Sequence, residues 1–317
     1  MRVSTLQLNS NMQFNMNSTS TSMNKLLVQM SSGKRILSPS DDVLASNQLL
    51  GLQDDIGRLE NHKKNIDSSK NALSLTETSM KEMGNVMNRV RDLVLATGSA
   101  AQDRTDSANL QEIKLLVGNL RDLANTKAGS GEHIFAGTQG DKAPVSETAG
   151  KHKVGGTDDV RKVQVSDSQK VKLGTTVKDL FNLDIEAAPG TDKSDFNDSV
   201  DTSNIFNALE EFVTRAGDKD LSDDDFKEIL ANTIEAVDQS QGQMNRGLTE
   251  IGASMKTLEL AADSNSEMQT FNKSLISSLE DVDMAKATSE FAIKKLQLEA
   301  GQKAFAMVSK INLFNFI

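Results

Sequence analysis

An apolar side chain recurs at every seventh position between residues 52 and 94, and this regularity limits the fold more than any other feature. The positions are Leu52, Leu59, Ile66, Leu73, Met80, Met87 and Val94. A seven-residue repeat keeps one stripe of a helix apolar and is typical of coiled coils. Burying each such side chain stabilises a fold by about 1.5–3 kcal/mol. The repeat therefore predicts one long helix over residues 43–97 that packs against another helix.

Three further segments show helical spacing. Residues 104–127 place Leu110, Ile113, Val117, Leu120 and Ala124 on one face. Residues 202–216 repeat the pattern with Ile205, Leu209 and Phe212. Ser222 followed by three Asp is a strong helix start, and it predicts a long helix from there to about residue 264.

Residues 1–33 look disordered by composition, since Ser, Thr, Asn and Gln dominate them. A three–four spacing nevertheless runs through Asn9, Met12, Met16, Thr19, Met23, Leu26 and Met30. Met and Thr make a softer stripe than Leu and Ile, and such a helix is marginal alone in water. It is expected to need a partner that covers the stripe.

The last segment, residues 267–313, carries two apolar stripes. The first comprises Leu275, Leu279, Val282, Ile293, Leu296, Ala300, Ala304, Val308 and Ile311. The second, nearly opposite, comprises Met284, Ala287, Phe291, Leu298 and Phe305. A helix with two apolar faces must contact two neighbours. One neighbour is expected to be the N-terminal helix, and the other is expected to come from another molecule.

The ending Leu313, Phe314, Phe316 and Ile317 is also apolar. It has two readings: a helix end tucked into its own core, or a surface covered by another molecule. The second is favoured because chain ends usually fray, which would leave large side chains exposed.

A joint at residues 30–42, MSSGKRILSPSDD, separates the first two helices. Gly33 suits the position after a helix end, where a positive φ is needed. Pro39 resists continuation, Ser40 is the expected N-cap, and Asp41 and Asp42 suit the positive end of the next helix dipole. Lys34 and Arg35 supply two cations. The joint could be an ordinary loop, but the sequence before it is polar with a soft stripe and the sequence after it has a regular apolar repeat. This difference favours a role in assembly.

Residues 128–200 change to Gly, Lys, Thr and Asp, with Pro144 and Pro189 near the edges. Val163 and Val165 alternate with polar residues, Asp167-Ser168 marks a turn, and Val171 and Leu173 alternate again. This pattern predicts a β-hairpin within a small β-rich insert.

Together these patterns predict a mainly α fold: a nested antiparallel bundle of long helices with both termini at one end, plus the β-rich insert. The expected domains are residues 1–40 with 272–317, a terminal coiled coil; 41–135 with 196–271, a helical bundle; and 136–195, the exposed insert.

Composition excludes several classes of function. With 35 basic and 45 acidic residues the net charge is −10, which argues against nucleic acid binding. The chain has no Cys, Trp or Tyr, so thiolate metal sites are excluded. No apolar run is long enough to insert into a membrane, and residues after Met1-Arg2 do not form a cleavable signal peptide. Export, if it occurs, is expected to use another route.

No catalytic motif is apparent. His62, His133 and His152 are too scattered for a metal motif, and Gly33-Lys34 lacks the rest of a phosphate-binding loop. Asp223-Asp224-Asp225 lacks the Gly and Glu of a calcium loop, so helix capping explains it better. The expectation is a protein that is not an enzyme and has no cofactor or metal.

Two stretches resemble one known family. MSSGKRILSPSDDVLASNQLL, residues 30–50, is similar to the N-terminal signature of bacterial flagellins and their hook–filament junction relatives. SLEDVDMAKATSEFAIKKLQLEAGQKAFAMVSKINLFNFI, residues 278–317, resembles their C-terminal signature. The start MRVST, the SPSDD run, EHIFAGTQGDKAPV at 132–145 and the ending NLFNFI resemble the junction relatives more than filament flagellins.

The resemblance implies a secreted, extracellular structural subunit of the bacterial flagellum at the hook–filament junction. It implies terminal segments that are unfolded in the monomer and fold on assembly, and copies arranged in a ring-like layer. The implied partners are a hook-side junction protein, flagellin or a cap protein, and an export chaperone on the C-terminal segment. The expected assembly residues are Met12, Met16, Met23, Leu26, Met30, Leu279, Val282, Phe291, Ile293, Leu296, Leu298, Phe305, Val308, Ile311, Leu313, Phe314, Phe316 and Ile317, with the joint residues Gly33, Lys34, Arg35, Pro39, Asp41 and Asp42.

Three alternatives remain open at this point. The chain could be a filament flagellin subunit itself. The insert could be an adhesive or recognition domain on a flagellin-like scaffold. It could also carry an enzyme, although it lacks a plausible metal or nucleophile site.

Overall fold

A computed structural model describes residues 2–99, 108–148, 151–183, 204–218 and 220–314; of residues 2–6 and 308–314 only the backbone is described. The chain divides into two compact units. Unit 1 comprises residues 1–60 and 266–317, and unit 2 comprises residues 61–265. The three-domain division expected from the sequence stays a prediction.

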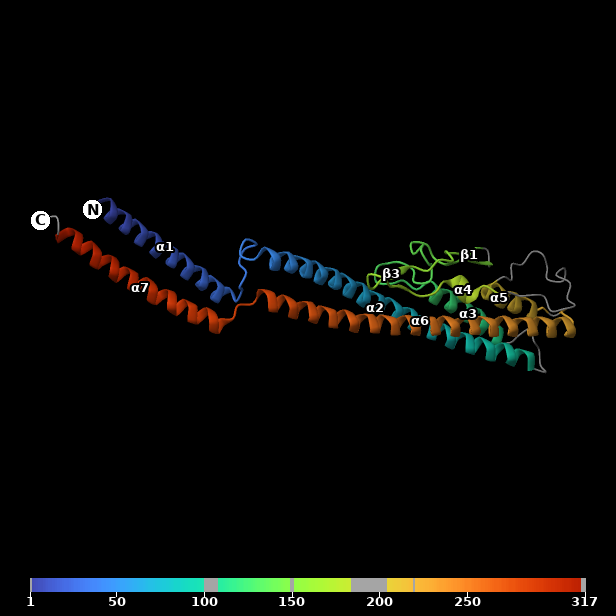
Figure 1. The fold of residues 1–317 in the computed structure, drawn as a ribbon. Helices are drawn as coiled ribbons and strands as arrows, with labels where there is room; N and C mark the ends of the chain where they lie inside the picture. The colour runs from blue at the N-terminus through green and yellow to red at the C-terminus, as the bar shows by residue number, and fades with distance from the viewer. Residues whose placement is uncertain (1, 100–107, 149–150, 184–203, 219, 315–317) are drawn as a thin grey trace. The chain divides into compact units, whose positions relative to one another are not determined.

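Unit 1 is built from helices that come from the two ends of the chain. Helix α1 (Arg2–Ser32) lies beside α7 (Met284–Phe314), and the start of α1 meets the end of α7 at one end of this unit (Figure 1). The unit also contains the first part of α2 (Val43–Ser99) and the last part of α6 (Asp223–Glu280). Ile36, Ala45 and Leu49 form a small core with Ile276 and Leu279. The predicted nesting of the chain ends is confirmed here.

Unit 2 holds the large hydrophobic core. The heptad positions from Ile66 to Val94 are fully buried, whereas Leu52 and Leu59 in unit 1 are half-buried. All five residues of the predicted face of α3 (Ala108–Ala124) are also buried. Helix α5 (Ile205–Ala216) adds Phe206, Leu209 and Phe212 to the same core. The helices predicted over residues 43–97, 104–127 and 202–216 are therefore confirmed, with ends that differ by a few residues.

Helices α2 and α6 pack antiparallel in unit 2. A Cβ on Gly247 would lie 2.8 Å from Met80 Cε, so the absence of a side chain at 247 allows close packing there. Further along, Arg91 Nε lies 2.7 Å from Asp238 Oδ1. The contacts run in opposite directions along the two helices, which is the geometry of an antiparallel coiled coil.

Two β-hairpins pack against these helices. Strands β3 (Lys162–Gln164) and β4 (Lys170–Lys172) form the predicted hairpin, with Val163 opposite Val171. Strands β1 (Val145–Thr148) and β2 (Lys151–Val154) form a second hairpin, which the sequence did not predict. The short helix α4 (Val177–Phe181) was not predicted either. Val145, Val171 and Phe181 belong to the same core as the helices, so the described part of the insert shares that core. Pro189 lies outside the described residues.

One helix boundary was predicted wrongly. The sequence suggested a break between residues 264 and 267, but α6 continues to Glu280 and α7 starts at Met284. The run Ser264-Asn265-Ser266 looks like a loop, yet it contains neither Gly nor Pro, and Asn265 is buried within the helix. The break falls instead at Asp283, whose carboxylate Oδ1 accepts from the N–H groups of Ala285 (3.0 Å) and Lys286 (3.1 Å) and caps α7.

Candidate assembly surface

The joint at residues 33–42 is paired with the break between α6 and α7. Gly33 has φ of 72°, as predicted for the residue after a helix end. Its carbonyl accepts a hydrogen bond from Val282 N at 2.9 Å, and Arg35 N donates to the Glu280 carbonyl at 2.6 Å. Lys34 and Asp281 thus form a one-residue antiparallel bridge. The chain leaves α1 and enters α7 at one shared point.

Charged side chains hold this point together. Lys34 Nζ lies 2.6 Å from Glu280 Oε1, and Arg35 Nη2 donates to the Leu279 carbonyl at 2.8 Å. Arg35 Nη1 also pairs with Asp42 Oδ2 at 3.2 Å. The side chains of Lys34 and Arg35 are 52% and 46% exposed, so solvent screens both ion pairs and each contributes little to stability by itself. Their combined effect is to fix the two connectors against each other.

The two acids of the joint have separate structural roles. Asp41 Oδ2 accepts from the N–H groups of Leu37 and Ser38, and Asp41 Oδ1 lies 2.5 Å from Lys25 Nζ. The hydrogen bond from Lys25 is the main cause that lowers the pKa of Asp41. Asp42 Oδ1 accepts from Ala45 N at 3.0 Å, and this bond, followed by that from Arg35, lowers the pKa of Asp42.

Asp42, rather than Ser40, is therefore the N-cap of α2. The sequence prediction of Ser40 was wrong because the turn after Pro39 is longer than expected, and the Ser40 hydroxyl instead pairs with the Ser38 hydroxyl at 2.6 Å.

Helices α1 and α7 pair through one face of each. A Cβ on Gly301 would lie 3.5 Å from Met16 Cγ, which places these residues opposite each other. An antiparallel register continued from that contact places Met12 opposite Phe305 and Leu26 opposite Phe291. The seven positions of the α1 stripe, Asn9, Met12, Met16, Thr19, Met23, Leu26 and Met30, are all buried or half-buried. On α7 the matching positions are Ala287, Phe291, Lys294, Leu298, Gly301 and Phe305, and all six are buried or half-buried.

The other apolar face of α7 is left open. Ile293 is 53% exposed, Leu296 68% and Met307 61%, and Ala300 on the same face is exposed. On α1, Phe14 is 73% exposed. Large apolar side chains at this exposure, repeated along one helix face, mark an interaction surface. We call the face formed by Ile293, Leu296, Ala300 and Met307 the open face of α7.

The sequence-predicted assembly residues therefore fall into separate groups. Met12, Met16, Met23, Leu26, Met30, Phe291, Leu298 and Phe305 lie along the α1–α7 contact, whereas Ile293 and Leu296 lie on the open face. Leu279 and Val282 are half-buried at the joint. The side chains of Val308, Ile311, Leu313, Phe314, Phe316 and Ile317 lie outside the described part of the chain. The part that each residue plays in assembly stays a prediction.

Sequence reasoning missed three members of these sites. Lys294 and Gly301 complete the α7 stripe, but neither has an apolar side chain, so a search for apolar spacing does not find them. Lys294 is half-buried, and long cationic side chains often place their aliphatic stem along apolar surface. Glu280 was missed because its role depends on a contact with Lys34, far away in the sequence.

The three histidines lie apart in unit 2. His62 Nε2 is 3.2 Å from Asp167 Oδ1, and His133 Nδ1 is 2.8 Å from the Asn125 carbonyl. His152 is buried against Phe206, and burial lowers its pKa. Among the described residues no three His, Asp or Glu side chains are grouped closely enough to hold a metal ion. Within the same residues, no helix has the length and hydrophobicity that a bilayer crossing requires.

Comparison with known proteins gives the same family at both ends of the chain. Residues 3–140 match the model of the bacterial flagellin N-terminal helical region, and residues 234–317 match the bacterial flagellin C-terminal helical region. These two matches together cover more than half of the chain. The chain therefore belongs to the bacterial flagellin family and is a structural component of the flagellum, not an enzyme.

Within this family, the chain is similar over nearly its whole length to flagellar hook-associated protein 3. It is 27% identical to that of Escherichia coli strain K12 over 291 residues, 90% of each chain. It is 25% identical to that of Salmonella typhimurium strain LT2 over 320 residues, 99% of each chain. Flagellin of Bacillus subtilis strain 168 is 25% identical over 300 residues, 93% of this chain and 92% of that protein.

Solved structures share the fold. Hook-associated protein 3 of Legionella pneumophila superposes with a TM-score of 0.60 at 16% identity, over 72% of this chain and 98% of that one. FlgL of Xanthomonas campestris gives a TM-score of 0.59 at 16% identity, over 71% of this chain and 99% of that one.

Proposed function

We propose that this protein is a junction subunit between the hook and the filament of the bacterial flagellum. Several copies form one ring-like layer, which contacts a hook-side junction protein on one side and flagellin or a cap protein on the other. Similarity to hook-associated protein 3 over 90–99% of the chain supports this position in the flagellum.

The observation that carries the assembly mechanism is the difference between the two faces of α7. One face is covered by α1, while Ile293 and Leu296 on the other face remain exposed. The stripe of α1 is rich in Met and Thr, and isolated helices of this kind are marginal in water. The terminal pair therefore reaches full stability only when neighbouring subunits cover the open face. Association supplies the free energy that ordering of the helices costs.

Coupled folding is also compatible with export. A terminal segment that is unfolded before assembly can pass through a narrow channel, and a chaperone on the C-terminal segment would cover its apolar stripes until then. Binding of such a chaperone is expected to protect residues 284–314 from proteolysis in the free subunit, and equal cleavage with and without it would oppose this part of the proposal.

The experiment that tests the junction role is complementation. In a strain that lacks its own junction protein, the wild-type chain is expected to restore filaments attached to the hook, while the purified chain alone forms no long filaments. Filament flagellin is the second candidate, favoured by the similarity to Bacillus subtilis flagellin over 93% of the chain. Long filaments grown from the purified chain alone would select that candidate.

A further inference from the structure

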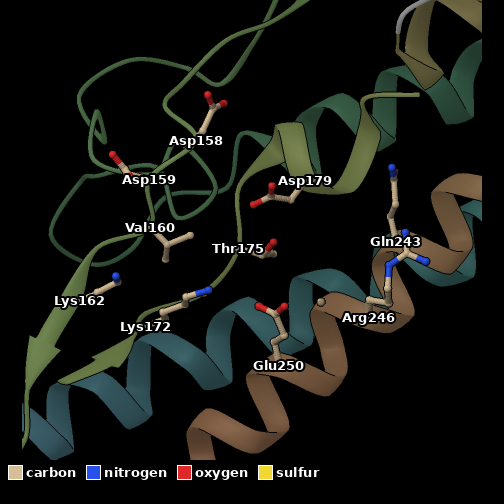
Figure 2. Close-up of a pocket in the computed structure, with 12 residues that line it drawn as sticks. Asp158, Asp159, Val160, Lys162, Lys172, Thr175, Asp179, Gln243, Arg246 and Glu250 are labelled. Atoms are coloured by element: carbon tan, nitrogen blue, oxygen red, sulfur yellow. The ribbon is translucent and has the colours of Figure 1, made fainter. Parts of the chain in front are cut away.

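A polar cleft in unit 2 lies outside the α1–α7 pair and the joint. It is formed by α6, the loop at residues 158–160, the β3–β4 hairpin and the segment that leads into α4 (Figure 2). Its volume is about 450 Å³. Clefts of this size fall in the range that holds small molecules.

Three cations on this cleft lack ionic partners among the described residues. Lys162 and Lys172 are directly opposite each other in the β3–β4 register, and Arg246 projects from α6. Like charges directly across a two-stranded sheet are destabilising. In Figure 2 the Lys172 side chain extends from β4 toward the middle of the cleft, and Arg246 borders it from the helix. A bound anion would relieve the repulsion between the two lysines.

The backbone of the cleft adds two donors. The N–H groups of Gly174 and Thr175, both buried residues, donate no hydrogen bond to any described residue. Gly174 has φ of 119°, a conformation that glycine adopts without strain. Successive backbone N–H groups at such a bend form a concave site that suits anions. Because both residues line the cleft, these N–H groups are available to an acceptor on a bound ligand.

The acids of the cleft divide into two pairs. Asp158 is paired with Lys178 at 3.0 Å, and Asp179 Oδ2 accepts from the Thr176 hydroxyl at 2.8 Å. The carboxylates of Asp159 and Glu250 have no such partner among the described residues. They accept hydrogen bonds only, so a ligand that fits beside them must present donors as well as an anion.

We propose that this cleft binds an acidic sugar, meaning a hydroxylated ligand that carries a carboxylate or a sulfate. Its anionic group lies at Lys162, Lys172, Arg246 and the Gly174–Thr175 amides, and its hydroxyl groups donate to Glu250 and Asp159. The insert of this flagellar subunit thereby recognises a polysaccharide, in addition to the structural role of the helices.

Titration calorimetry on the full-length protein at low ionic strength tests this assignment. The probes are a glucuronate-containing disaccharide, a sulfated disaccharide, neutral chitobiose and inorganic sulfate. At least one acidic disaccharide is expected to bind at least about tenfold more tightly than chitobiose or inorganic sulfate, and to weaken as salt rises. The preferred probe identifies the acidic group.

Variants test whether binding depends on the cations of the cleft or on the surface charge of the hairpin in general. Lys172→Gln and Arg246→Gln, on different elements, are each expected to raise the Kd of the acidic disaccharide about tenfold. Lys170→Gln is the matched control, since it removes the same charge from the same exposed hairpin face outside the cleft. Glu250→Gln is expected to weaken the disaccharide but not inorganic sulfate.

Three results would overturn the assignment. One is that neither acidic disaccharide binds more tightly than chitobiose. The second is inorganic sulfate as tight as the disaccharides, which would leave a simple anion site. The third is an equal loss in Lys170→Gln, which would mean that the lysines only protect the hairpin edge from aggregation. Unchanged thermal unfolding of each variant shows that its fold is intact.

Discussion

Replacement of Leu296 by Ala on the open face of α7 should weaken assembly while leaving the isolated subunit almost unchanged. Full burial of a leucine side chain contributes about 1.5–3 kcal/mol. Leu296 is 68% exposed in the single chain, so covering the remainder in an assembly contributes about two thirds of that, or about 1–2 kcal/mol for each subunit contact. This free energy corresponds to a factor of about 5–30 in the association constant. Ala is the best helix former, so the helix itself is not weakened.

The assay compares two quantities for each variant. Thermal unfolding of the dilute subunit, followed by circular dichroism, reports its own stability, and incorporation into hook–filament junctions in a junction-deficient strain reports assembly. Leu115→Ala is the matched control, because Leu115 is 76% exposed on α3, which belongs to unit 2 and not to the terminal pair. If Leu296→Ala assembled as well as the wild type, or if Leu115→Ala lost as much, the open face of α7 would not be a contact between subunits.

Three further predictions concern the core, the joint and one histidine. Leu73→Ala, at a fully buried heptad position, should lower the unfolding free energy of unit 2 by about 2–5 kcal/mol in denaturant titration; a loss below 1 kcal/mol would contradict the heptad core. Gly33→Val should cost about 1–3 kcal/mol of backbone strain at φ 72° and should lower incorporation into junctions more than it lowers the unfolding temperature of the subunit. Gly33→Asn is the control, because Asn tolerates a positive φ. An equal loss of incorporation and of thermal stability would mean that the joint has only a structural role. Burial lowers the pKa of His152 below the ordinary value of 6.5, so the stabilisation from its neutral form is full above that pH and is lost as the pH falls below it. The unfolding temperature should therefore drop between pH 7.5 and 5.5, and His152→Phe should reduce that drop.

Long periodic helices could be predicted from the sequence because their signal is local. The heptads from Ile66 to Val94 and the three–four stripe from Asn9 to Met30 follow from helix geometry alone; the structure buries the heptad positions fully and the stripe at least in part. Gly33 was predictable for the same reason, since a positive φ after a helix end has few other solutions. The pairing of the chain ends followed from the two apolar stripes near the C-terminus.

The remaining features depend on contacts between distant residues. Asp42 rather than Ser40 caps α2 because the turn after Pro39 is held by Asp41, which in turn is bound by Lys25. The β1–β2 hairpin has four-residue strands with little alternation, and part of its support comes from Asn207, whose side-chain oxygen accepts from His152 N at 2.7 Å. Lys25 is 16 residues from Asp41 and Asn207 is 55 residues from His152, so no short window of sequence contains either contact.

The polar cleft of unit 2 could not be predicted from the sequence for the same reason. Lys162, Lys172 and Arg246 look like ordinary solvated charges in the sequence, and only the strand register and the packing of α6 bring them to one cleft.

Amide hydrogen exchange along the dilute, unassembled subunit shows whether the terminal helices are ordered before assembly. We expect rapid exchange throughout α1 and α7 and slow exchange in α2 from Ile66 to Val94, where the heptad positions are fully buried. After assembly the exchange in α1 and α7 should slow by orders of magnitude. Equal protection of the terminal helices and the central core in the free subunit would contradict folding coupled to assembly.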